Sequence, residues 1–186
     1  MSQPSIALIF NPAARGDKAR RFRESLGQLR NECTLLETTG PGSATALAAQ
    51  AVHDGCKTIV ASGGDGTVNE VVNGLAQARS GLGQAQLGIL PLGTMNVFAR
   101  ELGIPLSPRR AWETVRLGQA RAVDLPLAKV QTDAGQTERC FVQMALPFDQ
   151  SKSMMDQPTV RSGSMYPLLL PSQRSVIKSR LLQTLA

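Results

Sequence analysis

Histidine and cysteine are scarce in this 186-residue sequence. It contains one histidine, His53, and three cysteines, Cys33, Cys56 and Cys140. A single histidine excludes a histidine-rich metal site, and its expected position at the surface end of a helix argues against a Ser-His-Asp hydrolase. The cysteines are widely separated, so they match neither a disulfide framework nor a zinc motif and suit a reducing compartment. We expect His53 to be a surface residue at the end of a helix rather than a catalytic base.

Aromatic residues and long apolar runs are also few. Five Phe, one Tyr and one Trp occur, so base stacking is a poor expectation and we expect no specific nucleic-acid binding. No apolar run approaches the ~20 residues that a membrane-spanning helix needs. The N-terminal segment MSQPSIALIFNP lacks the basic region and cleavage site of a signal peptide. The sequence therefore predicts a cytoplasmic protein.

Positive charge is concentrated toward the C-terminus. The formal net charge is +6, and five basic side chains but one acidic side chain fall after residue 150. The part before residue 150 is therefore nearly neutral. A basic tail of this kind would favour an anionic membrane or nucleic acid. An unstructured basic end is the simpler interpretation.

The apolar pattern predicts alternating strands and helices. Short apolar runs bounded by turn residues predict strands, and apolar residues at helical spacing predict helices. The strands are expected over residues 5–10, 33–38, 57–62 and 87–90, and the helices over 18–30, 46–52, 68–75, 95–102 and 108–117. Two more strands, over 121–130 and 138–145, flank a polar loop. Such alternation indicates an α/β fold with a mainly parallel sheet.

Ligands of parallel sheets bind at the carboxyl ends of the strands. Three loops leave strands there: NPAARG (residues 11–16), SGGDGT (62–67) and PLGT (91–94). The glycines of SGGDGT leave room for phosphates near the backbone. The helix that follows directs its free N–H groups and its positive dipole end at the same place. The spacing matches neither the Rossmann nor the P-loop pattern.

Two further features of this glycine loop need an explanation. Thr67 and Glu70 have the spacing of a capping box, so capping of the helix start is an alternative to a ligand role. Asp65 is a carboxylate in the middle of the loop, and phosphates repel it unless a cation or a hydroxyl lies between them. Mg²⁺ reaches phosphates through one or two carboxylates and several waters, and a ligand hydroxyl donating to Asp65 would also satisfy the charge. Both alternatives predict phosphoryl chemistry here.

The paired motifs resemble a known family. SGGDGTVNEVVNGL (residues 62–75), followed by LGILPLGTMNVFARELGIP (87–105), is similar to the catalytic domain of diacylglycerol kinases and related lipid kinases. The glycine loop alone leaves an NAD kinase-like enzyme open, whereas the second motif favours the lipid-kinase branch. The resemblance covers about residues 5–145. It implies a three-layer, mainly parallel α/β nucleotide-binding domain over residues 1–145.

The resemblance also implies a function and a site. It implies an ATP-dependent lipid kinase that uses Mg²⁺ and phosphorylates the hydroxyl of a diacylglycerol- or sphingoid-type lipid at a membrane surface, from the inner face. Asp65 would bind the metal or orient the acceptor. For Asn96 a site role is expected, with a turn or capping role as the alternative, and Phe98 and Leu102 are expected in the core. The implied nucleotide-site residues are Asn11, Thr38, Gly63, Gly64, Asp65, Gly66, Thr67, Asn69, Glu70, Gly93, Thr94 and Asn96.

The resemblance ends near residue 145. In the family a second, β-rich domain follows and supplies the acidic general base, and we expect that domain and that base to be missing here. Residues 146–186 are interpreted as a divergent basic tail, either frameshifted or disordered. The alternative is a genuine segment with a short helix near residues 175–185. Three functions stay open: a lipid kinase, a nucleotide-binding fragment that transfers nothing, and a basic membrane or nucleic-acid binder.

Overall fold

Four parallel strands form the centre of the molecule. The computed structural model describes residues 5–12, 14, 17–29, 31–78, 81–123, 125, 127–132, 135–142 and 179–183. The central strands are β1 (Ile6–Phe10), β2 (Thr34–Glu37), β3 (Thr58–Gly63) and β4 (Gln86–Pro91). They pair in the order β2-β1-β3-β4, and each neighbouring pair is parallel. The predicted α/β fold with a mainly parallel sheet is confirmed.

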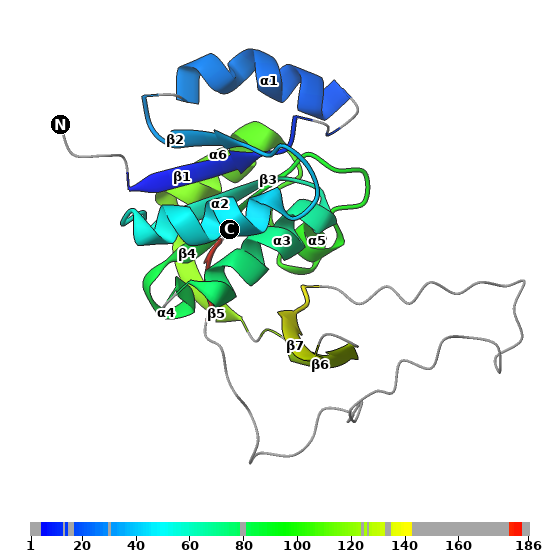
Figure 1. Cartoon of the computed structure of the whole chain (residues 1–186). Helices are drawn as coiled ribbons and strands as arrows, with labels where there is room; N and C mark the ends of the chain where they lie inside the picture. Colours follow the sequence, from blue (N-terminus) through cyan, green and yellow to red (C-terminus); the bar gives the residue numbers. More distant parts are fainter. Residues whose placement is uncertain are drawn as a thin grey trace, which may run out of the picture.

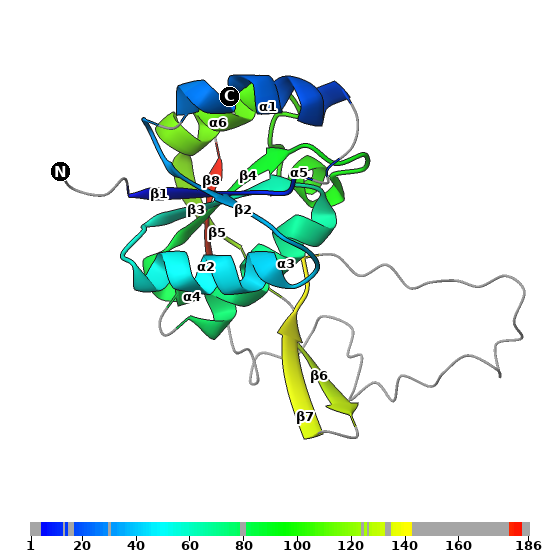
Figure 2. The same ribbon diagram turned by 45° about the horizontal axis from the view of Figure 1, so that its top comes forward.

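Helices cover both faces of this sheet (Figure 2). One face carries α1 (Asp17–Leu29) and α6 (Pro108–Leu117), and the other carries α2 (Ser43–His53), α3 (Asp65–Gln77) and the short α4 (Gly81–Gln84). The helix α5 (Val97–Glu101) follows β4. The predicted three layers are therefore present. The sequence did not predict α4, because its four residues, GLGQ, are too few to show an apolar helical periodicity.

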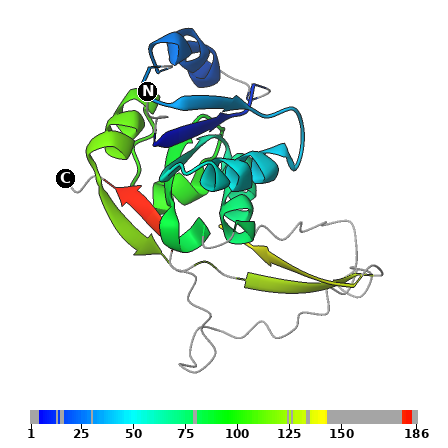
Figure 3. The same cartoon turned by 60° about the vertical axis from the view of Figure 1, so that its left-hand side comes forward.

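The sheet extends to six strands in the order β2-β1-β3-β4-β8-β5 (Figure 3). β8 (Ser179–Gln183) pairs parallel with β4 and antiparallel with β5 (Gln119–Val123). The strand predicted over 121–130 is wrong, because the chain divides there into β5 and β6 (Leu127–Thr132). β6 pairs antiparallel with β7 (Gly135–Cys140) in a separate two-stranded sheet. The sequence has a proline at position 126, and because proline has no N–H to donate to a strand ladder, it disfavours one continuous strand over 121–130.

β8 lies within the stretch interpreted above as a tail. Residues 179–183 form a strand, so the alternative of a short helix near 175–185 is wrong for these residues. The rest of residues 146–186 lies outside the described residues. Their interpretation as frameshifted or disordered stays a prediction, which the coding sequence around codons 140–150, read in all three frames, would test.

The core lies on both faces of the parallel strands. Leu8 of β1, Ile59 of β3 and Leu87 of β4 are all fully buried, as expected where helices cover a parallel sheet on both sides. Phe22 of α1 packs on Phe10 with ring centroids 5.9 Å apart. Phe98 and Leu102 are buried as predicted. Among the described residues, no helix is long and apolar enough to cross a bilayer.

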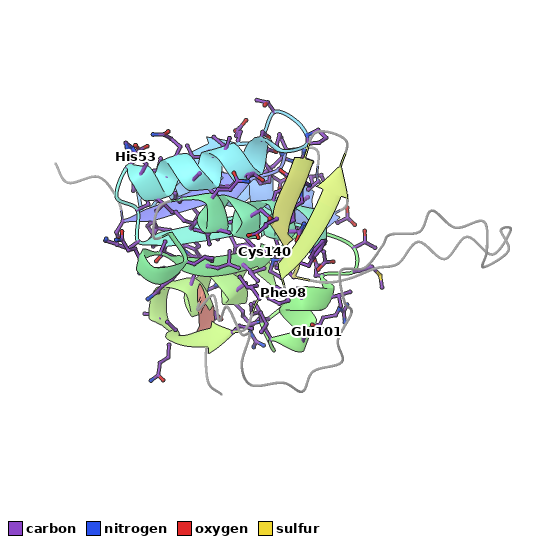
Figure 4. The ribbon with its side chains drawn as sticks, turned by 60° about the horizontal axis from the view of Figure 1, so that its bottom comes forward. His53, Phe98, Glu101 and Cys140 are labelled. Atoms are coloured by element: carbon purple, nitrogen blue, oxygen red, sulfur yellow. The ribbon has the colours of Figure 1, made fainter. Side chains whose placement is uncertain are left out.

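His53 is the last residue of α2, and its side chain is exposed, as predicted. Figure 4 shows it at the far end of α2, away from α5. Its Nδ1 lies 3.5 Å from Oδ1 of the neighbouring Asp54. The three cysteines are buried and far apart in the chain: Cys33 precedes β2, Cys56 lies between α2 and β3, and Cys140 is the last residue of β7. None of these four side chains belongs to the carboxyl edge of the sheet described next.

Candidate nucleotide-binding site

The carboxyl ends of the central strands bring the predicted loops together. Asn11 follows β1, and its N–H donates to Ser62 O of β3 at 3.2 Å. Thr38 follows β2, and its N–H donates to Phe10 O of β1 at 2.9 Å. In Figure 1 the loops that precede α3 and α5 lie at the end of the sheet toward which β1 points. The predicted convergence of these loops at one edge is confirmed.

The glycine loop (residues 63–66) and the PLGT loop (91–94) contact each other through their backbones. The N–H groups of Leu92 and Gly93 donate to Gly63 O at 2.9 and 3.2 Å. A Cβ atom added at Gly93 would lie 2.5 Å from Gly64 Cα. Since two backbones cannot give way as a side chain can, glycine at position 93 is needed for the two loops to meet.

Gly66 differs from these packing glycines. It is the second residue of α3 and is exposed, and an added Cβ there would meet no described atom within 4 Å. Its φ is not positive, unlike that of Gly42, Gly55 and Gly103. Glycine inside a helix costs about 1 kcal/mol relative to alanine, and neither packing nor backbone conformation requires it here. The open space lies at the N-terminal turn of α3, where N–H groups lack helical partners and favour an anion.

Asp65 is the first residue of α3 and is half-buried. Its Oδ1 accepts the N–H of Phe98, in the first turn of α5, at 3.2 Å. The carboxylate therefore joins the starts of two helices, a structural role that the sequence analysis missed. Among the described residues, none bonds to its second oxygen.

Asp65 alone is sufficient for one mode of Mg²⁺ binding. In that mode the ion binds one or two carboxylates and completes its shell with substrate phosphates and water. Within the described part of the chain, no group of three or more His, Cys, Asp or Glu side chains forms a protein metal centre. Asp65 therefore fits a metal that arrives with the phosphates, and it does not fit a resident metal site.

The capping-box explanation of Thr67 and Glu70 is wrong. α3 begins at Asp65 after Gly64, and no side chain caps it. Thr67 is buried within the first turn. Glu70 instead caps α2, because its Oε2 accepts the N–H of Ala44 at 3.2 Å. Glu70 thus holds the start of the helix that follows Thr38 and the turn over residues 39–42.

Asn96 shapes the PLGT loop. It has a left-handed φ of 49° and is buried. Its Oδ1 accepts the N–H of Gly93 at 3.0 Å, and its Nδ2 donates to Gly93 O at 2.6 Å. Thr94 and Met95 between them are exposed. The turn role left open by the sequence is therefore present in the structure, and a nucleotide contact by Thr94 stays a prediction.

The sequence profile of the diacylglycerol kinase catalytic domain matches residues 5–128. The chain belongs to this family. Among curated lipid kinases, the "Probable lipid kinase YegS-like" of Enterobacter sp. (strain 638) is 34% identical over 145 residues, and that of Citrobacter koseri is 37% identical. Both matches cover 76% of this chain and 45% of the relative. The chain thus spans just under half the length of these two lipid kinases.

Solved diacylglycerol kinase structures share the fold. A diacylglycerol kinase of Bacillus anthracis str. Sterne superposes with a TM-score of 0.55 at 28% identity, covering 70% of this chain and 47% of that chain. The family match includes the glycine loop, the PLGT loop and α3. The family resemblance seen in the sequence is confirmed.

One predicted site residue of this kinase-family chain has a partner that the motif does not reveal. Asn69 accepts the N–H of Val142 with its Oδ1 at 3.4 Å, so it contacts the segment that follows β7. Asn73, one turn further along α3, bonds to Cys140 at the end of β7 and was missed. The available signal was a pair of asparagines four residues apart in a helix, where asparagine is a poor helix former.

Proposed function

We propose that this chain binds Mg·ATP at the carboxyl edge of its sheet as the nucleotide-binding part of a lipid kinase. The reaction transfers the γ-phosphoryl group to a hydroxyl of a diacylglycerol- or sphingoid-type lipid at the inner face of a membrane. The observation that supports this most is the open space at Gly66, over the N-terminus of α3 and beside the Asp65 carboxylate. Family membership supports the class of reaction.

The residues at the carboxyl edge of the sheet have different roles in the proposed binding. The N–H groups at the start of α3 bind phosphate oxygens, since they lack helical partners and lie at the positive end of the helix dipole. Asp65 would hold Mg²⁺, which when bound neutralises the phosphate charge during transfer. Thr38 and Asn11 line the neighbouring strand ends, where the nucleoside would lie. Asn96 and Glu70 act indirectly, because they hold the PLGT loop and the start of α2.

A matched pair of glycine variants tests the binding site. Gly66→Val puts a side chain into the proposed phosphate space, whereas Gly27→Val puts one on an exposed position of α1 that is equally open. We expect Gly66→Val to abolish Mg·ATP binding in calorimetry and Gly27→Val to bind like the parent, with both variants folded. Equal affinity in all three proteins would overturn the proposed site.

A second function, nucleotide binding without transfer, is favoured by the carboxylates at the edge. Asp65 is assigned to Mg²⁺ in this proposal, and the Oε2 of Glu70 accepts the N–H of Ala44 at the start of α2, so among the described residues of the loops neither carboxylate is left to act as the general base. General-base catalysis contributes ~10²–10⁴ in rate. We expect the 186-residue chain to show no lipid phosphorylation above background with radiolabelled ATP and diacylglycerol micelles. Clear turnover would place a base elsewhere in the chain and favour the full kinase reaction.

A further inference from the structure

Two asparagine side chains of α3 form hydrogen bonds with the backbone at the end of β7 and just after it. Asn73 accepts the N–H of Cys140 with its Oδ1 at 2.9 Å and donates to Cys140 O with its Nδ2 at 2.8 Å. The same Nδ2 donates to Asn69 O at 2.8 Å. Asn69 accepts the N–H of Val142 at 3.4 Å. We call these four residues the asparagine clamp.

The geometry of helix and strand explains why the clamp fits. Residues four apart in an α-helix are ~6 Å apart along its axis, and residues two apart in a strand are ~6.6 Å apart. Residues 69 and 73 can therefore meet residues 142 and 140, with the strand running antiparallel to the helix. An asparagine amide carries both a donor and an acceptor, as a peptide group does, so it can satisfy both backbone groups of one residue.

The clamp connects α3, which packs on the central sheet, with β7 of the separate two-stranded sheet. β7 pairs only with β6 among the described strands, in a sheet separate from the central one. Figure 2 shows this hairpin projecting beyond α3, and Figure 4 labels Cys140 on the strand that lies beside the helix. Cys140 and Val142 are 1% and 8% exposed. Unpaired backbone groups would be costly at such buried positions, so the clamp holds this end of the hairpin against α3.

We propose that Asn73, assisted by Asn69, is a positioning residue that couples the nucleotide site to the β6–β7 hairpin. The proposal rests on the proposed function, because α3 begins at Asp65, at the proposed phosphate space. A nucleotide on the first turn of α3 restrains the helix, and the clamp passes that restraint to residues 140–142. Coupling is reciprocal, so a hairpin held in place also favours nucleotide binding. Residues 140–142 are then held at a fixed position on α3.

Cysteine labelling in the 186-residue chain tests this coupling. Cys140 is buried and the clamp holds its backbone, so we expect its thiol to react with a thiol reagent when the clamp opens. Cys33 and Cys56 are buried in the main domain and should report its unfolding. Labelling at each cysteine is followed by peptide mass spectrometry, with and without saturating Mg·ATP. We expect Mg·ATP to slow labelling of Cys140 at least fivefold, about the size of an ordinary coupling between sites.

Variants on α3 identify the residues responsible. Asn73→Ala removes two hydrogen bonds to Cys140 and should speed labelling of Cys140 about tenfold. It should also abolish the slowing by Mg·ATP. Asn69→Ala removes one long bond and should have the same effects at about two- to threefold. Gln77→Ala changes an exposed side chain one turn further along and is the matched control, with parental rates expected.

Each other result overturns the inference in a recognisable way. If all three cysteines react faster together in Asn73→Ala, Asn73 contributes only to global stability. If Mg·ATP protects Cys140 equally in that variant, the restraint does not pass through the clamp. Mg·ATP binding without protection of Cys140 in the parent overturns the coupling alone, whereas absence of Mg·ATP binding in calorimetry overturns the proposed function and the coupling together. Should Asn73→Ala fail to fold, Asn69→Ala decides by the same criteria.

Discussion

The two faces of the central sheet are packed in different ways. Between α2 and α3 the contacts involve the backbone: Thr45 Oγ1 donates to Glu70 O at 3.0 Å, and a Cβ added at Gly74 would overlap Thr45 O. On the face that carries α1 and α6 the contacts are made by long side chains, among them Glu32 from the connection between α1 and β2. Glu32 Oε2 accepts from Trp112 Nε1 at 3.4 Å and lies 3.2 Å from Arg116 Nε, and a cavity of about 800 Å³ remains there.

Because of this difference, the face that carries the proposed site should tolerate substitutions less well than the face that carries α1 and α6. α3 begins at the glycine loop, so the helix that presents the phosphate site is also the one fixed by backbone contacts. Side chains can change rotamer to absorb a substitution, whereas packed backbones cannot. None of the predicted site residues lines the cavity between α1 and α6. We therefore expect substitutions on the α2–α3 face to affect nucleotide binding most.

Substituting alanine for one glycine on each face should give the largest difference in the free energy of unfolding. Gly74→Ala puts a methyl group into Thr45 O and close to Ala48, and should cost about 3 kcal/mol of unfolding free energy. Gly88→Ala meets the Val115 side chain at 2.9 Å, which can shift, and should cost about 1 kcal/mol. Urea denaturation measures both. Equal losses would show that the two faces are equally rigid.

Asp65→Asn tests the charge at the start of α3. An amide oxygen can still accept the N–H of Phe98, so the fold should be retained. Loss of the negative charge should weaken Mg·ATP binding tenfold or more, by about 1.4 kcal/mol at least, and change binding of metal-free ATP far less. Calorimetry with and without Mg²⁺ measures this. Equal weakening of both forms would exclude the metal role and leave the structural one.

Glu70→Ala on the α2–α3 face and Trp112→Phe on the α1–α6 face compare the effect of a similar loss of stability on Mg·ATP affinity. Glu70→Ala removes the side chain that caps α2 and should cost about 1 kcal/mol. Because that helix follows Thr38, Mg·ATP affinity should fall about fivefold. Trp112→Phe removes the bond to Glu32 at a cost of about 1 kcal/mol and should leave the affinity unchanged. A similar loss of affinity in both variants would contradict the division between the faces.

The smallest expected effect is a pH dependence at Cys33, beside the C-terminal end of α1. Burial, with a contribution from Glu32, raises the pKa of this thiol from 9.0 to about 11. Between these values the folded protein keeps a proton that the unfolded chain loses, so stability falls as pH rises. At pH 10 the loss should be about 1 kcal/mol relative to pH 8. Cys33→Ala should lack this part of the decline in urea titrations at both pH values.

Much of the fold follows from local sequence patterns. Strands β1 to β4 and helices α1, α2, α3, α5 and α6 were predicted from apolar spacing and turn residues, because these signals lie within single elements. The edge at which the loops meet also follows, since parallel strands end on the same side. The motifs around residues 62–75 and 87–105 were sufficient to indicate the family.

The tertiary structure alone decided which partners the site residues have. Glu70 bonds to Ala44, 26 positions away, and Asn73 bonds to Cys140, 67 positions away. The pairing of β8 between β4 and β5 is equally remote in sequence. A local pattern shows that a side chain can donate or accept a hydrogen bond, but the partner depends on how separate elements pack. For this reason the sequence determined the elements and the loops and left two roles open for Asn96, while the hydrogen-bond partners of Asp65, Glu70 and Asn73 emerged only from the folded chain.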